Sequence, residues 1–68
     1  MSKFIKFRDN TGTNYIVDSK IIKAVSYRDG NEYIKLFYTD MDEPALYFFE
    51  SSRVANYYYD LIWEQLNK

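Results

Sequence analysis

Short runs of alternating apolar and polar residues occupy roughly the first fifty positions of the chain. Ile5 and Phe7 alternate with Lys6 and Arg8, which is the two-residue period of a half-buried strand. Turn residues separate this run from the later ones, and the clearest turn contains an Asp-Gly pair at 29–30. The pattern predicts strands at about 3–8, 14–18, 21–27, 32–39 and 45–50.

The periodicity becomes helical after Ser51 and Ser52, either of which is a typical helix N-cap. Neither Pro nor Gly occurs beyond this point, so we expect one helix from about Ser52 to Leu66 or residue 67. Short connections favour an antiparallel meander of about five strands packed by that helix. The sequence therefore predicts a single α+β domain over 1–68, with a strongly curled sheet as a variant of this fold.

The expected helix has more apolar surface than one sheet face covers. Placing Val54 at zero and advancing 100° per residue predicts a core stripe and a second apolar flank, and leaves a polar band about 80° wide. The stripe comprises Val54, Tyr58, Leu61, Ile62 and Gln65, and the flank comprises Ala55, Tyr59, Trp63 and Leu66. Either the sheet curls around the helix and buries both, or the flank contacts another chain. We favour the second alternative and predict a homodimer through the flank.

Strand alternation also predicts an outer sheet face that mixes basic and aromatic residues. We expect the following residues to point at the helix: Ile5, Phe7, Ile22, Ala24, Ile34, Leu36, Leu46 and Phe48. The outward set is then Lys6, Arg8, Lys23, Tyr27, Tyr33, Lys35, Phe37, Tyr47 and Phe49. Rings that stack on bases beside cations that meet phosphates are typical of single-stranded nucleic-acid binding. Six of these residues are the candidates for it: Lys6, Arg8, Lys23, Tyr33, Lys35 and Tyr47.

Charge and composition limit which kinds of ligand and active site the chain can have. Residues 1–35 carry seven Lys or Arg and four Asp or Glu, whereas 36–68 carry two and six, so the two parts have net charges of +3 and −4. A pI near 5.2 opposes non-specific binding of polyanions. The chain contains no Cys and no His, which excludes thiolate and imidazole sites. We expect no catalytic residue, metal or cofactor, and we interpret the acidic loop Asp40–Pro44 as a solvated turn.

No apolar run reaches the ~20 residues that span a bilayer, and the segment from Met1 to Phe4 leads into the first strand without a signal-peptide core. We therefore expect a cytoplasmic protein without membrane contact. High usage of Lys, Asn, Ile and Tyr hints at an AT-rich genome, so an origin in a mobile element is one possibility.

Two families resemble the chain in different ways. The spacing of Tyr15-Ile16-Val17, Ile21-Ile22, Val25, Ile34-Lys35-Leu36 and Glu50-Ser51-Ser52-Arg53-Val54 resembles the small flagellar FlbD-like family, which implies a strand-rich body ending in a serine-started helix. Asp40–Pro44 stands where that family has a second Asn-Gly type turn. The predicted architecture is also similar to the positive-cofactor family, which implies a dimer that binds single-stranded DNA through a sheet backed by a helix. Neither resemblance assigns a role to a particular residue.

These observations predict a small non-enzymatic interaction module, an accessory or regulatory protein that pairs with itself or with another protein. The alternative is a single-stranded nucleic-acid-binding protein that uses the outer sheet face.

Overall fold

Five strands and one long helix make up the computed structural model, which describes residues 3–67. The lead-in at Met1 and Ser2 and the last residue of the predicted domain lie outside the described residues. The predicted α+β class with one C-terminal helix is confirmed. In chain order the elements are β1 (Phe4–Arg8), β2 (Asn14–Asp18), the 3₁₀ helix η1 (Ser19–Ile21), β3 (Ile22–Ser26), β4 (Tyr33–Tyr38), β5 (Ala45–Phe48) and α1 (Ser52–Leu66).

The strands form two antiparallel sheets, and the prediction of one five-stranded meander is wrong. β1 pairs with β2, and β3, β4 and β5 form a separate sheet in that order. The break falls at η1, where the Asp18 side chain accepts a hydrogen bond from the Lys20 N–H at 3.0 Å. Such a cap favours a local turn over continued strand pairing, so the chain leaves one layer and enters the other.

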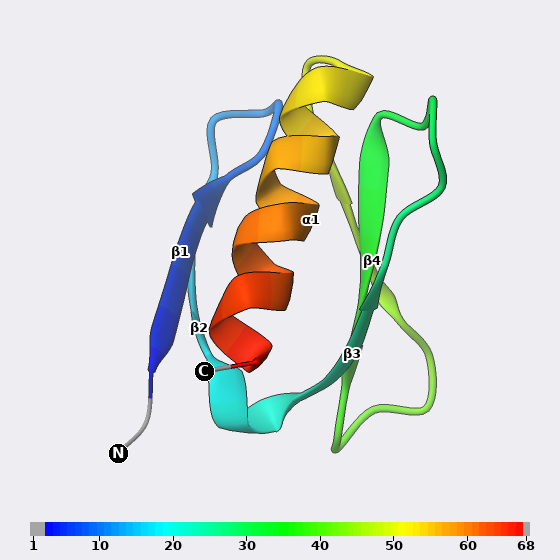
Figure 1. Cartoon of the computed structure of the whole chain (residues 1–68). Coiled ribbons are helices and arrows are strands. Elements are labelled where there is room, and N and C mark those ends of the chain that lie inside the picture. The colour runs from blue at the N-terminus through cyan, green and yellow to red at the C-terminus, as the bar shows by residue number, and fades with distance from the viewer. Residues whose placement is uncertain (1–2, 68) are drawn as a thin grey trace.

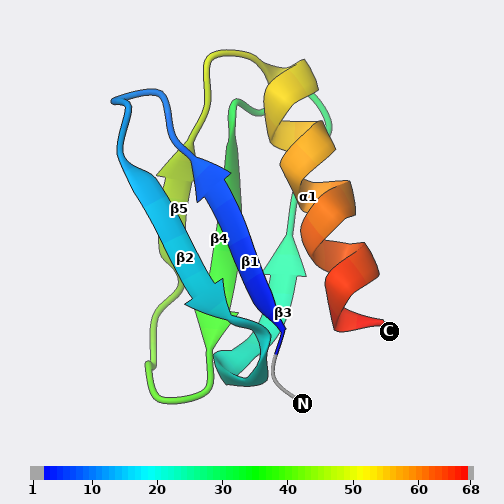
Figure 2. The ribbon, with the colours of Figure 1, turned by 90° about the vertical axis from the view of Figure 1, so that its left-hand side faces the viewer.

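The two sheets face each other, and α1 closes one open side between them (Figures 1 and 2). The ring of Phe7 on β1 lies 4.9 Å from that of Tyr47 on β5, and Tyr15 on β2 also lies 4.9 Å from Tyr47. α1 contacts β1, β3 and β4, so it touches both sheets. Aromatic side chains from both sheets therefore meet in the space between the two layers.

The core receives residues from both sheets and the helix. Its buried members among the described residues are Ile5, Phe7, Val17, Ile22, Ile34, Leu36, Tyr38, Phe49, Ala55 and Ile62. The buried line of α1 runs through Ala55 and Ile62, and not around Val54 as predicted, because two sheets cover the helix from two sides. On one side Tyr58 stacks on Phe49 at 5.0 Å.

Strand alternation explains five of the eight residues predicted to face the helix and fails for three. Ala24, Leu46 and Phe48 are exposed instead. A register shift between Ile22 and Ala24 marks a β-bulge, which changes the face of every later residue on β3. On β5, Phe48 is the cross-strand partner of Tyr33. Because partners share a face, Phe48 points outward with Tyr33 while Phe49 is buried.

α1 begins at a serine cap. Ser51 has an extended backbone, and its hydroxyl accepts a hydrogen bond from the Val54 N–H at 3.3 Å. The cap satisfies one of the N–H groups that the first turn leaves free. It fixes where the chain turns from β5 onto the open side of the two sheets.

Candidate functional site

The helix flank predicted to contact another chain lies mostly inside the monomer. Ala55 is fully buried, and Tyr59 and Leu66 pack against the core. Tyr59 has an intramolecular neighbour, because its ring lies 5.6 Å from that of Tyr27, just beyond the end of β3. Only Trp63, at 53% exposure, remains on the surface of this flank. A partner contact through Trp63 stays a prediction.

The six residues predicted to bind nucleic acid do not share one surface. Lys6 and Arg8 are exposed residues of β1, whereas Lys23 and Lys35 belong to the opposite sheet. Since the two sheets face each other, their outer faces point in opposite directions (Figure 2). Tyr47 points inward, where its hydroxyl lies 2.7 Å from that of Tyr38. Of the six, Tyr33 and Lys35 remain together, and Lys23 belongs to the same sheet but lies toward its opposite end.

Tyr27 was also predicted to face outward, and the bulge in β3 explains why it does not. After the bulge Val25 and Tyr27 turn inward, and the Tyr27 hydroxyl donates a hydrogen bond to the Ser52 carbonyl at 3.2 Å. Tyr27 therefore ties the end of β3 to the start of α1.

The outer side of the three-stranded sheet is the most apolar exposed strand surface in the described chain. We call it the aromatic face, and its residues are Ala24, Tyr33, Lys35, Phe37, Leu46 and Phe48. Leu46 and Phe48 are 49% and 47% exposed. The rings of Tyr33 and Phe48 lie 5.2 Å apart. Lys35, on the central strand opposite Leu46, places one cation among apolar side chains.

A hollow of about 210 Å³ lies at the end of the aromatic face near the β3–β4 turn. We call it the basic hollow, and its lining residues are Ser26, Tyr27, Arg28, Asn31, Tyr33 and Lys35. Arg28 and Lys35 are both cations, and no carboxylate lines the hollow. The turn beside it contains Gly30 at a φ of 92°, a left-handed conformation that a side chain would disfavour. This arrangement suits an anionic group presented beside an aromatic surface.

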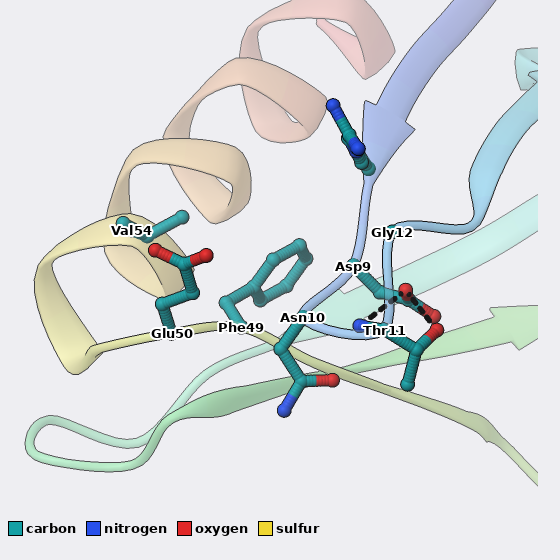
Figure 3. A pocket seen from close by; sticks show the side chains of 8 residues that line it. Asp9, Asn10, Thr11, Gly12, Phe49, Glu50 and Val54 are labelled. Carbon is teal, nitrogen blue, oxygen red and sulfur yellow. Dashed lines mark hydrogen bonds between the residues drawn. The ribbon is translucent and has the colours of Figure 1, made fainter.

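A larger hollow, about 470 Å³, lies between the β1–β2 turn and the start of α1. Figure 3 shows Glu50 and Val54 on one side and the turn from Asp9 to Gly12 on the other, with Phe49 between them. Its charged side chains have opposite signs, since Arg8 also lines it. The hollow therefore offers no uniform charge to a ligand.

The Asp9 carboxylate in this hollow accepts hydrogen bonds from the β1–β2 turn and from Tyr15 beside it. Its Oδ1 accepts hydrogen bonds from the Thr11 hydroxyl at 2.6 Å, the Thr11 N–H at 2.9 Å and the Thr13 N–H at 3.0 Å. Its Oδ2 accepts one from the Tyr15 hydroxyl at 2.9 Å. These donors, the Thr11 hydroxyl above all, hold the pKa of Asp9 below its usual value. The carboxylate organises the hairpin turn and is a poor general base.

A third hollow, of about 280 Å³, opens between β2 and the β4–β5 loop. Ile16, Ile21 and Met41 line it with largely exposed apolar side chains, and Tyr38 and Tyr47 also contribute. Burial, together with the hydrogen bond to Tyr47, raises the pKa of the Tyr38 phenol well above its usual value. The phenol therefore stays protonated at neutral pH and acts as a structural contact.

Residues 3–67 contain neither the side-chain grouping of a metal site nor a helix of membrane-spanning length. Within that range no three His, Cys, Asp or Glu side chains are grouped so that they could hold a metal ion. The same residues include no helix with the length and apolar character needed to span a membrane.

Sequence reasoning missed Leu46 and Phe48 as surface residues, although a signal for them exists. Ala45 to Phe49 is a continuous apolar run, and such runs are typical of strands that are covered on both faces. Comparison with protein-family models, curated proteins and solved structures gave no match, so the resemblances to the flagellar and positive-cofactor families stay predictions.

Proposed function

We propose that this chain is a small non-enzymatic protein-interaction module whose aromatic face is covered by a protein partner. The observation that supports it is the apolar character of both sides of β4 and β5. Ile34 and Leu36 are fully buried on the inner side, while Phe37, Leu46 and Phe48 occupy the outer side. An antiparallel sheet with one solvated face normally alternates apolar and polar residues. A second apolar face is therefore expected to have its own cover.

The composition of the aromatic face favours a protein over a small molecule. Phe, Tyr and Leu side chains surround one cation, and aromatic anchors of this kind are enriched at the centres of protein interfaces. The face is a flat strand surface, whereas pockets that hold small molecules bury most of the ligand in a concave site. We assign the module an accessory or regulatory role in the cytoplasm.

Single-stranded nucleic acid is the second candidate for the same face. The basic hollow favours it, because Arg28 and Lys35 lie beside Tyr33, whose ring adjoins Phe48. Two bases could stack on these rings while a phosphate meets the two cations. At the other end of the sheet the β4–β5 loop carries Asp40, Asp42 and Glu43, which would repel a continuing phosphate backbone.

A photo-crosslinking amino acid at position 48 tests the proposal in the cell that makes the protein. The matched control carries the same group in place of Asn14, an exposed residue on the outer side of β2. We expect ultraviolet light to join the chain to a protein from position 48 and not from position 14. Crosslinks from position 48 to nucleic acid would favour the second candidate. Equal crosslinking from both positions, or none from position 48, would contradict both.

A further inference from the structure

A basic hollow lies at one end of the aromatic face and an acidic loop at the other. The basic hollow with Arg28 lies at the β3–β4 turn. At the opposite end β4 runs into the loop that holds Asp40, Met41, Asp42 and Glu43, all of them exposed. Figure 1 shows the two connections at opposite ends of β4. We call residues 40–43 the acidic loop.

Each end also carries charges of the opposite sign. Asp29 and Glu32 belong to the β3–β4 turn but do not line the basic hollow. Lys23 is exposed near the start of β3, close in register to the acidic-loop end, because neighbouring Ile22 pairs with Tyr38. Lys20 is also exposed near that end, because the carbonyl of the neighbouring Ile21 accepts a hydrogen bond from the Thr39 N–H. Three carboxylates against two ammonium groups leave that end negative. The hollow itself has two cations and no acidic lining residue.

A two-fold rotation brings these opposite ends together. When two copies meet face to face about an axis that crosses the strands, each end of one copy meets the other end of its partner. A strand of six residues spans roughly 20 Å, and the same span separates the two charged ends in both copies. Two charge contacts then form at once, and the apolar middle of one face covers that of the other. The long stem of Lys35 allows its ammonium to reach the edge of such a contact.

We infer that the module forms a two-fold homodimer in which the acidic loop of each copy lies on the basic hollow of the other. This inference rests on the proposed function and names the partner as a second copy of the chain. Both complementary halves of the contact belong to one chain, and the loop contributes its exposed carboxylates Asp42 and Glu43 to it, whereas Asp40 and Met41 of the same loop line the third hollow beside β2. Another protein partner would need to supply both halves by itself.

Two charge-reversed variants test the arrangement. The first carries Arg28→Glu and Lys35→Glu, and the second carries Asp40→Lys, Asp42→Lys and Glu43→Lys. In sedimentation equilibrium we expect the unmodified chain to approach twice its mass of 8.2 kDa. Each variant alone should associate on the order of 100-fold more weakly, because like charges then meet at both ends. An equimolar mixture of the two variants should regain the dimer, since both contacts become complementary again.

Control variants reverse charge elsewhere: the first reverses two cations, as the Arg28 and Lys35 variant does, and the second reverses two carboxylates, one fewer than the acidic-loop variant. Lys6→Glu with Arg8→Glu alters the outer side of β1, and Asp60→Lys with Glu64→Lys alters the exposed side of α1. Both controls should dimerise like the unmodified chain. Circular dichroism of every variant establishes that it is folded before its mass is interpreted.

Three results would overturn the inference: a monomer at millimolar concentration, variants that dimerise as the unmodified chain does, or a mixture that stays monomeric. The failure of the homodimer can be distinguished from the failure of the proposed function, because the crosslinking experiment tests the latter separately. A monomeric chain that still crosslinks from position 48 to another protein would remove the homodimer and keep the interaction module. Crosslinking that is equal from positions 48 and 14 would remove the module even if the chain dimerised.

Discussion

The outer sides of the two sheets differ in how many of their positions are apolar. On the β1–β2 hairpin, Lys6 and Arg8 alternate with the buried Ile5 and Phe7. On the three-stranded sheet the outer side carries Phe37, Leu46 and Phe48, although its inner side is already the core. The hairpin follows the alternation of a solvated sheet, and the larger sheet follows that of a covered one. The comparison teaches that apolar character alone does not place a residue in the core of this domain.

The hairpin is not free of exposed apolar residues, which makes the comparison testable. Phe4 and Ile16 are 65% and 68% exposed on its outer side. Their cross-strand partners are polar, because Ile16 pairs with Lys6 and Phe4 pairs with Asp18. Ile16 also borders the third hollow, which Ile21 and Met41 line with exposed apolar side chains. The outer side of the hairpin therefore mixes apolar and charged residues, whereas the aromatic face surrounds one cation with apolar side chains.

The largest expected effect separates the two sides of β4. Leu36→Ala should lower the free energy of unfolding by about 2–5 kcal/mol, because Leu36 is fully buried and its truncation leaves a cavity. A domain of this size has little stability in reserve, so we expect the variant to be largely unfolded. Urea denaturation followed by circular dichroism measures the change.

The neighbouring Phe37→Ala is the matched control, because Phe37 follows Leu36 on the same strand and points outward. In the isolated monomer it should cost under about 1 kcal/mol. Equal losses for the two variants would show that the outer side is as important to the fold as the inner one.

The sequence predicts those features of the structure that neighbouring residues determine, and it does not predict those that depend on a partner strand. The helix and its serine cap follow from residues near Ser51, and the inner rows of β1 and β4 follow from strict alternation. The bulge after Ile22 and the pairing of Tyr33 with Phe48 depend on the partner strand, so alternation within one strand could not predict them.

The sequence pattern did not predict which residues of the α1 flank and of the two sheets share a surface, because this depends on how the layers pack. The flank of α1 was interpreted against one sheet, whereas two sheets cover the helix and bury Ala55. The short η1 turn that splits the strands into two layers carries a weak sequence signal. Once the layers are separated, Lys6 and Lys35 can no longer contribute to one surface.

A second, smaller effect concerns the inner side of the three-stranded sheet at alkaline pH. The raised pKa of Tyr38 means that the folded state holds this proton more tightly than the unfolded chain does. Its contribution to stability is therefore complete below pH ~10, the usual phenol pKa, and is lost as the pH rises further. Tyr38→Phe should cost about 1 kcal/mol at neutral pH through the lost hydrogen bond to Tyr47.

The difference in stability between Tyr38→Phe and the unmodified chain should shrink as the pH rises above ~10, since only the unmodified chain loses the contribution. Urea titrations between pH 8 and 11 measure it. A difference that is constant across this range would mean that the Tyr38 proton is not held by the fold.

A third effect concerns the hairpin at acid pH. The lowered pKa of Asp9 means that its charged form stabilises the folded turn. This contribution is present above the usual carboxyl pKa of 3.8 and is lost as the pH falls through the lower folded value. Asp9→Asn should remove that pH dependence while keeping an oxygen acceptor for Thr11 and Thr13.

NMR spectra of the Thr13 amide between pH 6 and 2 follow this turn directly. Asp42→Asn is the control, because Asp42 is an exposed carboxylate of the acidic loop and is distant in sequence from the turn. We expect it to leave the Thr13 titration unchanged. A titration that persists in Asp9→Asn would assign the acid response to another carboxylate.

The smallest expected effect is the sharpest test of the comparison. Ile16→Ser removes the most exposed large apolar side chain of the described residues, and Phe48→Ser removes one from the aromatic face. Both side chains are surface residues of the monomer, so each change should alter monomer stability by about 0.5 kcal/mol or less.

The two variants should differ in association. If a second copy of the chain covers the aromatic face, Phe48→Ser weakens self-association and makes the midpoint of thermal unfolding independent of concentration, because mass action no longer favours the folded state. Ile16→Ser should leave both properties as they are. If Ile16→Ser disrupts association and Phe48→Ser does not, the roles of the two outer faces are reversed, and the hairpin is the surface that a partner covers.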